Sequence, residues 1–136
     1  MTDSLAIFLP FIERSDARGG LVVIEEGPSL PFAVKRAYWV YSTKSDVARG
    51  FHAHRNLRQI CYCVAGSVQM RLFDGKQEET ILLKPGTGGL LLPAMLWHEM
   101  HDFSPDCILT VLADAEYDEA DYIRDRDQFI RHVHSS

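Results

Sequence analysis

Two histidines stand one residue apart in the segment Gly50-Phe51-His52-Ala53-His54, just ahead of a strand-forming run, 60–64. Side chains alternate between the faces of an extended segment, so His52 and His54 point to the same side. Gln59 lies where the sheet can direct a third polar group toward the same space. Imidazole has an ordinary pKa of about 6.5, which suits it to accept and return protons near neutral pH. The pair therefore predicts acid–base chemistry, with His52 and His54 as candidate catalytic residues.

Each candidate has a structural alternative. Both histidines could be hydrogen-bonded residues of a sheet without chemistry, but two imidazoles on one face, among arginines and aromatics, favour a functional site. For His98 and His101 the two interpretations stay balanced, since either residue could position others. Tyr38 and Trp97 could be core aromatics, and Trp97 could otherwise line a sugar or base pocket beside His98.

Composition places the chain among single-domain globular proteins. It has 136 residues, of which 46% are hydrophobic, and we expect one domain over residues 1–136. No apolar run approaches the roughly 20 residues of a membrane span, and the N-terminus lacks the pattern of a signal peptide. Three cysteines, Cys61, Cys63 and Cys107, are an odd and uneven set. This usage indicates reduced thiols and a cytoplasmic location rather than a disulfide framework.

Charge is unevenly distributed along the chain. The net charge is −5 and acidic residues crowd positions 114–121, which argues against nucleic-acid binding. Basic residues gather in the first half, around the histidine pair: Arg14, Arg18, Lys35, Arg36, Arg49, Arg55 and Arg58. A locally basic pocket in an acidic protein suits a small anionic ligand such as a nucleotide phosphate. The alternative for any one arginine is solvated surface charge.

Short apolar runs separated by turn residues must position these groups. We predict strands at 1–13, 21–25, 34–41, 49–64, 67–73, 79–83, 90–93 and 107–113, with an interrupted segment at 94–101. Alternation puts Arg36, Tyr38 and Val40 on one face of their strand, and Asp74-Gly75 predicts a hairpin. Residues 121–133 have the spacing of a helix that docks outside. The pattern indicates an all-β sandwich or barrel with a short C-terminal helix.

The histidines belong to a longer pattern. Gly50-x-His52-x-His54-x4-Gln59-x6-Gly66 matches the first cupin motif, and Pro93-x4-His98 matches the second, which predicts a cupin-type jelly-roll barrel. Cupins that bind metal carry a glutamate where Gln59 stands. A neutral amide weakens the binding of a divalent ion, so the site favours direct use of imidazole as acid or base. We therefore predict no metal and no cofactor.

Several blocks resemble one branch of the cupins. Those blocks are Arg18-Gly19-Gly20-Leu21, Lys35-Arg36-Ala37-Tyr38, Arg49-Gly50-Phe51-His52-Ala53-His54, 93–100 and 117–124. Together they are similar to the dTDP-sugar 3,4-ketoisomerases, also called WxcM-like cupins, from about residue 13 to residue 130. Members of this family carry glutamine at the position of Gln59 and work without metal as homodimers of jelly-roll subunits. They convert dTDP-4-keto-6-deoxyglucose to a 3-keto isomer, which supplies 3-amino-3,6-dideoxy sugars for surface glycans or antibiotics.

The resemblance implies a division of roles among the candidates. We expect Arg18, Arg36 and Arg49 to hold the pyrophosphate, and Gln59, Trp97 and His98 to contact the substrate. His54 is the preferred base at C3, while His52 or Tyr38 would move a proton between the two oxygens. The expected partners are the dTDP-linked 4-keto-6-deoxyhexose and a second subunit, with no nucleic acid and no membrane. Three alternatives remain: a metal-dependent cupin enzyme, a nucleotide-sugar epimerase, and a non-catalytic nucleotide-sugar binding protein.

Overall fold

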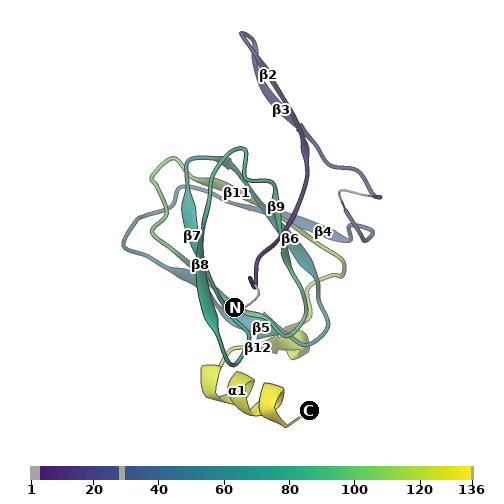
Figure 1. Cartoon of the computed structure of the whole chain (residues 1–136), viewed down its shortest axis with the longest axis vertical. Coiled ribbons are helices and arrows are strands. Elements are labelled where there is room, and N and C mark those ends of the chain that lie inside the picture. The colour runs from purple at the N-terminus through teal and green to yellow at the C-terminus, as the bar shows by residue number, and fades with distance from the viewer. Residues whose placement is uncertain (1–3, 28–29, 136) are drawn as a thin grey trace.

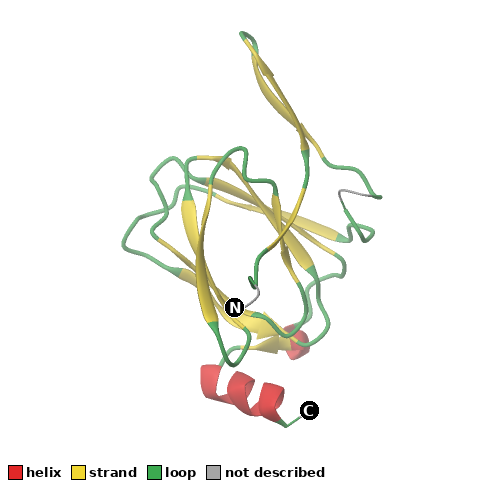
Figure 2. Ribbon diagram, viewed as in Figure 1, coloured by secondary structure: helices red, strands yellow, loops and turns green. Residues whose placement is uncertain are grey.

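The computed structural model describes residues 4–27 and 30–135, which form mainly antiparallel strands and one C-terminal helix (Figures 1 and 2). The strands are β1 (Ile7–Leu9), β2 (Ile12–Asp16), β3 (Gly19–Val23), β4 (Arg36–Val40), β5 (Arg49–His54), β6 (Gln59–Ala65), β7 (Val68–Phe73), β8 (Glu78–Leu83), β9 (Gly89–Leu92), β10 (Trp97–His101), β11 (Ile108–Ala113) and β12 (Tyr122–Ile123). A 3₁₀ turn, η1 (Glu119–Asp121), precedes β12, and the helix is α1 (Arg126–His134). The predicted all-β class with a short C-terminal helix is confirmed.

Two five-stranded sheets face each other and form the barrel. One has the order β1-β9-β6-β11-β4, and the other has the order β12-β5-β10-β7-β8. The inward faces enclose an apolar core, because alternation along each strand buries one side and exposes the other. On β4, for example, Tyr38 and Val40 point inward, while Trp39 is 56% exposed on the outer face.

The β2–β3 hairpin forms a separate ribbon that projects from the barrel (Figure 1). Its turn lies at Ala17 and Arg18, and all five residues of β2 are exposed. The strand predicted over residues 1–13 is therefore wrong as a single element, and residues 1–3 of it lie outside the described part. Pro10 separates β1 from β2, because proline has no backbone N–H to donate to a ladder.

The strand predicted over residues 49–64 is also two strands, and they belong to opposite sheets. β5 ends at His54 and β6 begins at Gln59. Carboxylates from the acidic segment hold the connection: Asp121 accepts from the backbone N–H groups of Asn56 and Leu57, and Asp114 accepts from that of Arg58. This break matters for the site, because it puts the histidines and Gln59 on facing walls of the barrel.

α1 packs against the outside of the second sheet, below β5 and β12 in Figure 1. Its Phe129 is fully buried, with ring centroids 5.9 Å from Phe73 and 5.8 Å from Trp97. The helix starts later than predicted because Asp125 caps it, accepting from the backbone N–H of Gln128, after η1 and β12 have used the preceding residues. No helical segment in the described part of the chain has the length and apolar character needed to cross a bilayer.

Candidate active site

Three histidines meet inside the barrel. His52 and His54 lie on β5, and His98 lies on the neighbouring strand β10, directly opposite His52. Their ring centroids are 5.0 Å apart for His52–His54 and 4.7 Å for His52–His98. The three rings offer nitrogen atoms within 4.8 Å of one another, and no carboxylate of the described residues belongs to this group. The paired orientation predicted for His52 and His54 is confirmed, with His98 as a third member.

A β-bulge directs these histidines inward. The register between β10 and β5 shifts so that His98 opposes His52 while Glu99 opposes Gly50, which leaves Phe51 as the extra residue. Gly50 and Phe51 both adopt positive φ angles, 91° and 62°. A Cβ at Gly50 would also come within 3.1 Å of the carbonyl oxygen of His98, so glycine is required there. Phe51 holds a strained backbone conformation, as residues beside functional sites often do.

Backbone carbonyls fix the tautomers of two of the rings. His52 Nδ1 lies 3.1 Å from the carbonyl oxygen of Gly50, and His98 Nδ1 lies 3.3 Å from that of Leu96. A carbonyl oxygen only accepts hydrogen bonds, so each Nδ1 carries the proton and each Nε2 keeps a free lone pair.

Burial keeps the histidines neutral. Loss of hydration, with a smaller contribution from the neighbouring imidazoles, lowers the pKa of His52 to about 4 and that of His98 to about 3. The pKa of His54 is also lowered by burial, although the carboxylate of Asp121, 3.3 Å from its Nδ1, acts in the opposite direction. Neutral imidazoles are the form that can accept a proton, so the cluster contains bases ready for use near pH 7.

Tyr38 and Gln59 complete the site from the facing sheet. The side-chain N–H of Gln59, itself 1% exposed, donates to the Tyr38 hydroxyl at 3.2 Å. Burial raises the pKa of Tyr38 to about 12, so the phenol stays protonated. Because Gln59 uses a lone pair of the phenol oxygen, the phenol proton remains free for donation to a substrate oxygen.

A pocket of about 290 Å³ opens beside the cluster. It is lined by Arg36, His54, Asn56, Leu57 and Tyr122, and by five residues of the acidic segment: Asp114, Ala115, Glu116, Asp118 and Asp121. The Arg36 guanidinium lies 4.8 Å from the ring centroid of Tyr38 and 5.4 Å from that of Tyr117. Its Nη1 atom is buried without a hydrogen-bond partner among the described residues. An unpaired buried cationic donor at a pocket is suited to an anionic oxygen of a ligand.

Two residues that received no role from the sequence belong to the site. Asp121 touches His54, and the Tyr122 ring packs against both catalytic candidates, 4.3 Å from His54 and 5.0 Å from His52. Arg124 lies 4.1 Å from the Tyr122 ring. The block 117–124 carries part of the family resemblance, but its acidic residues were considered only for their effect on the charge balance, so neither Asp121 nor Tyr122 received a role.

Trp97 requires a correction. It is buried on the outer face of β10, where it packs against Phe129 and donates from its indole N–H to Glu99 at 2.9 Å. Adjacent residues of a strand point to opposite faces, so an inward His98 places Trp97 outside the barrel. The substrate contact predicted for Trp97 is therefore wrong.

The basic pocket predicted around the histidines is not formed within one chain. Arg18 lies at the exposed hairpin tip and pairs with Asp16, and Arg58 pairs with Asp114. Arg49 lines a separate pocket of about 250 Å³ with Lys44 and other residues. Of the basic residues named from the sequence, Arg36 is the one that lines the pocket beside His54. Most of these arginines are thus paired or distant from the cluster.

Comparisons with known proteins place this geometry in context. The family model described as "FdtA: WxcM-like, C-terminal" matches residues 4–134. A curated protein from Aneurinibacillus thermoaerophilus, named TDP-4-oxo-6-deoxy-alpha-D-glucose-3,4-oxoisomerase, is 47% identical over 118 residues, which is 87% of this chain and 85% of that protein.

Solved structures agree with the sequence comparison. A 3,4-ketoisomerase from Helicobacter canadensis has a TM-score of 0.90 and 39% identity, covering 97% of this chain and 99% of that one. A mutant of the 3,4-ketoisomerase QdtA from Thermoanaerobacterium thermosaccharolyticum, in complex with TDP-4-keto-6-deoxyglucose, has a TM-score of 0.91 and 36% identity, covering 96% and 94%. The predicted cupin-type jelly roll is confirmed by this likeness to ketoisomerase structures. With a family match over almost its whole length and close relatives that share its fold, this chain belongs to the WxcM-like family described as FdtA.

Proposed function

We propose that this protein is an isomerase that moves the ketone of dTDP-4-keto-6-deoxyglucose from C4 to C3. The observation that carries the proposal is the cluster of three imidazoles inside the barrel, together with the Tyr38 hydroxyl that Gln59 holds on the opposite sheet. It supplies both a base for a C–H bond beside a ketone and an acid for the oxygen that becomes charged. The named 3,4-oxoisomerase at 47% identity and the QdtA mutant with TDP-4-keto-6-deoxyglucose support the same substrate.

The first step breaks the C3–H bond. The 4-ketone acidifies this hydrogen, and His54 takes it as a proton through Nε2, so that the electron pair moves into a C3–C4 double bond. The oxygen on C4 gains negative charge and becomes part of an enediolate. The contact with Asp121 supports His54 in this role, since a carboxylate neighbour favours the imidazolium that forms.

The second step forms the C4–H bond. A proton is added to C4, and the hydroxyl proton on O3 moves to O4. The product therefore has a ketone at C3 and a hydroxyl at C4, with no net oxidation. Tyr38 or His52 moves the proton between the oxygens. Tyr38 is suited to this transfer because its hydroxyl proton is free while Gln59 holds its oxygen.

We also propose that the protein acts as a homodimer. The β2–β3 ribbon exposes Ile12 and Leu21 by 50% and 56%, and the outer face of the first sheet exposes Trp39 and Val64 by 56% and 46%. A ribbon of two strands has little stability alone, so a second copy of the chain that covers these surfaces would stabilise it. In that arrangement the partner subunit's Arg18 would join Arg36 at the pyrophosphate.

Complementation between inactive variants tests this arrangement. Arg18→Ala and His54→Asn are each expected to have low activity, but co-refolded mixtures should regain part of it. One site of a mixed dimer would then combine an intact His54 with the partner's intact Arg18. If mixing restores nothing while dimers form, Arg18 does not act across the interface. Analytical ultracentrifugation measures the dimer itself.

The central experiment is incubation with dTDP-4-keto-6-deoxyglucose in D₂O, followed by NMR. Isomerisation predicts a 3-keto product with deuterium at C4. An unmoved ketone with an inverted, deuterated C3 or C5 would instead identify an epimerase. Binding of dTDP without any exchange would identify a non-catalytic nucleotide-sugar binding protein.

Treatment with a chelator tests the remaining alternative, a metal-dependent cupin enzyme. We propose that the reaction uses imidazoles without a bound ion, and that the protein works in the cytoplasm, as predicted from the sequence. Full activity of protein treated with a chelator is the expected result. Loss of activity with chelator and rescue by a stoichiometric divalent ion would establish a metal-dependent cupin enzyme instead.

A further inference from the structure

Strand pairing fixes the place of Asp121 beside His54. β12 pairs with the end of β5, so that Tyr122 opposes His54 and Ile123 opposes Ala53. The backbone carbonyl oxygen of Asp121 accepts from the N–H of Arg55 at 2.9 Å, which extends this pairing by one residue. The main chain at Asp121 is thus held against the end of the histidine strand.

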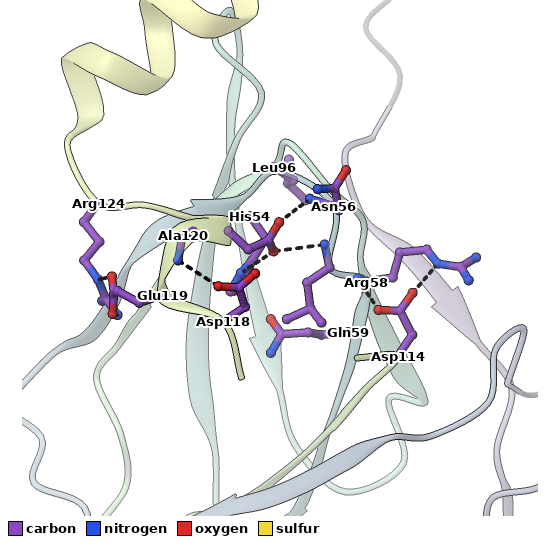
Figure 3. A network of polar contacts seen from close by, with 12 residues as sticks. His54, Asn56, Arg58, Gln59, Leu96, Asp114, Asp118, Glu119, Ala120 and Arg124 are labelled. Atoms are coloured by element: carbon purple, nitrogen blue, oxygen red, sulfur yellow. Dashed lines mark hydrogen bonds and ion pairs between the residues drawn. The ribbon is translucent and has the colours of Figure 1, made fainter. Parts of the chain in front are cut away.

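The Asp121 carboxylate is held as firmly as its backbone. Its Oδ1 accepts from the N–H of Asn56 at 2.8 Å, and its Oδ2 accepts from the N–H of Leu57 at 3.2 Å. Figure 3 shows His54 and Asn56 close together in this network. Backbone N–H groups only donate, so they favour the ionised carboxylate and aim it at a defined point.

That point is the Nδ1 atom of His54, 3.3 Å from Asp121 Oδ2. His54 is 3% exposed, and neither of its ring nitrogens has an aligned hydrogen bond among the described residues. Contacts of catalytic pairs are often loose before substrate binds and tighten afterwards. A buried imidazole with one nitrogen near a fixed carboxylate and the other unpaired is arranged for proton transfer at the unpaired one.

We propose that Asp121 is a positioning residue that holds His54 with its proton on Nδ1, so that Nε2 presents a lone pair to the substrate. A carboxylate accepts but does not donate, which makes this the compatible tautomer. Other groups that face His54 are Arg36 on β4, His52 on β5, His98 on β10, Tyr122 on β12 and Arg124 after it. None of these is an acceptor carboxylate, so the orienting contact is specific to Asp121. Its effect on turnover rests on the proposed function.

The chain offers a matched control for the structural part of this role. Asp114 lines the same pocket and also accepts from the connection between β5 and β6, at the N–H of Arg58, 3.0 Å away. Its other oxygen binds the Arg58 side chain at 2.8 Å (Figure 3). Asp114→Asn therefore weakens the same loop without changing a carboxylate beside His54.

Nitrogen-15 NMR of the ligand-free protein tests the tautomer directly. In the unmodified protein, we expect the His54 proton on Nδ1. The Asp114→Asn variant should have the same His54 tautomer, whereas in Asp121→Asn the tautomer equilibrium of His54 should shift toward the Nε2–H form. A His54 with its proton on Nε2 in the unmodified protein would overturn the proposal, whatever the variants do. This measurement needs no turnover, so it stands even if the proposed reaction is not found.

Steady-state kinetics test the consequence. Asp121→Asn should lower kcat by about 10²- to 10⁴-fold, because a carboxylate that fixes the tautomer of a catalytic imidazole contributes up to the larger value, and change KM by less than about threefold. Asp121→Glu should recover part of kcat. Equal losses of kcat in Asp114→Asn and Asp121→Asn would show that the loop alone is responsible and refute the positioning role. If the unmodified protein itself has no ketoisomerase activity, the proposed function fails instead.

Discussion

Acidification should destabilise this protein through its buried histidines well before its carboxylates titrate. The folded-state pKa values are about 4 for His52 and about 3 for His98, against an ordinary value of 6.5. Between these limits the unfolded chain binds protons that the folded chain cannot, so stability is complete above pH ~6.5 and falls as pH decreases. Burial lowers the pKa of His54 as well, and its contribution has the same sign.

The size of the effect follows from the difference between the pH and the pKa of histidine in the unfolded chain. At pH ~5 each imidazole lies about 1.5 pH units below its ordinary pKa, which corresponds to about 2 kcal/mol at 1.36 kcal/mol per unit. His52 and His98 together therefore cost up to about 4 kcal/mol between pH ~7.5 and pH ~5. Ordinary carboxylates titrate mostly below this window, so they add little to the difference. A domain of this size has a total stability of about 5–15 kcal/mol, so the change is easily measured.

Urea unfolding followed by circular dichroism at several pH values measures this slope. His52→Asn and His98→Asn should each reduce the loss between pH ~7.5 and pH ~5 by about 2 kcal/mol. His132→Asn, on the exposed part of α1, provides the baseline for the substitution itself. A free energy of unfolding that stays within about 0.5 kcal/mol over this range, or a slope that both cluster variants retain in full, would refute the assignment of buried neutral imidazoles.

Other substitutions test individual contacts. His54→Asn and His52→Asn should each lower turnover by about 10²–10⁴-fold with dTDP affinity retained, and near-full activity of both variants would contradict the proposed acid–base roles. Tyr38→Phe should lower kcat by about 10²-fold in the same assay, because the proton donor is lost while the ring remains; an unchanged kcat would leave oxygen protonation to His52. Phe129→Ala should cost about 3–5 kcal/mol in urea unfolding, since the ring is fully buried under the barrel, and a cost below about 1 kcal/mol would show that α1 contributes little.

Local patterns predicted the parts of the site that depend on one strand. Alternation alone places His52 beside His54, and Tyr38 on the inner face of β4. The same rule would have placed Trp97 outside the barrel, because it precedes the inward His98. The expectation of a substrate contact rested on the place of Trp97 next to His98 in the sequence, and neighbouring positions of a strand point to opposite faces.

Contacts between distant segments could not be predicted in this way. Asp121 is one of several carboxylates in an acidic run, and nothing in its neighbours distinguishes it from a solvated charge. Its role arises from the pairing of β12 with β5, more than sixty residues earlier in the chain. The position of Arg18 could not be predicted for the same reason, since the sequence does not show that the exposed hairpin projects away from its own barrel.

The extra residue at Phe51 has a consequence for how this segment can vary. In a strand, loss of one residue exchanges the two faces for everything on one side of the deletion. Phe51 is an exception because it is the unpaired residue of the bulge: without it, Gly50 and His52 would be consecutive and would still oppose Glu99 and His98. Loss of Ala53 would instead put the two imidazoles on opposite faces of β5. Relatives should therefore conserve the spacing between His52 and His54 strictly, whereas the bulge is the place in β5 where a change of length leaves the direction of the histidines unchanged.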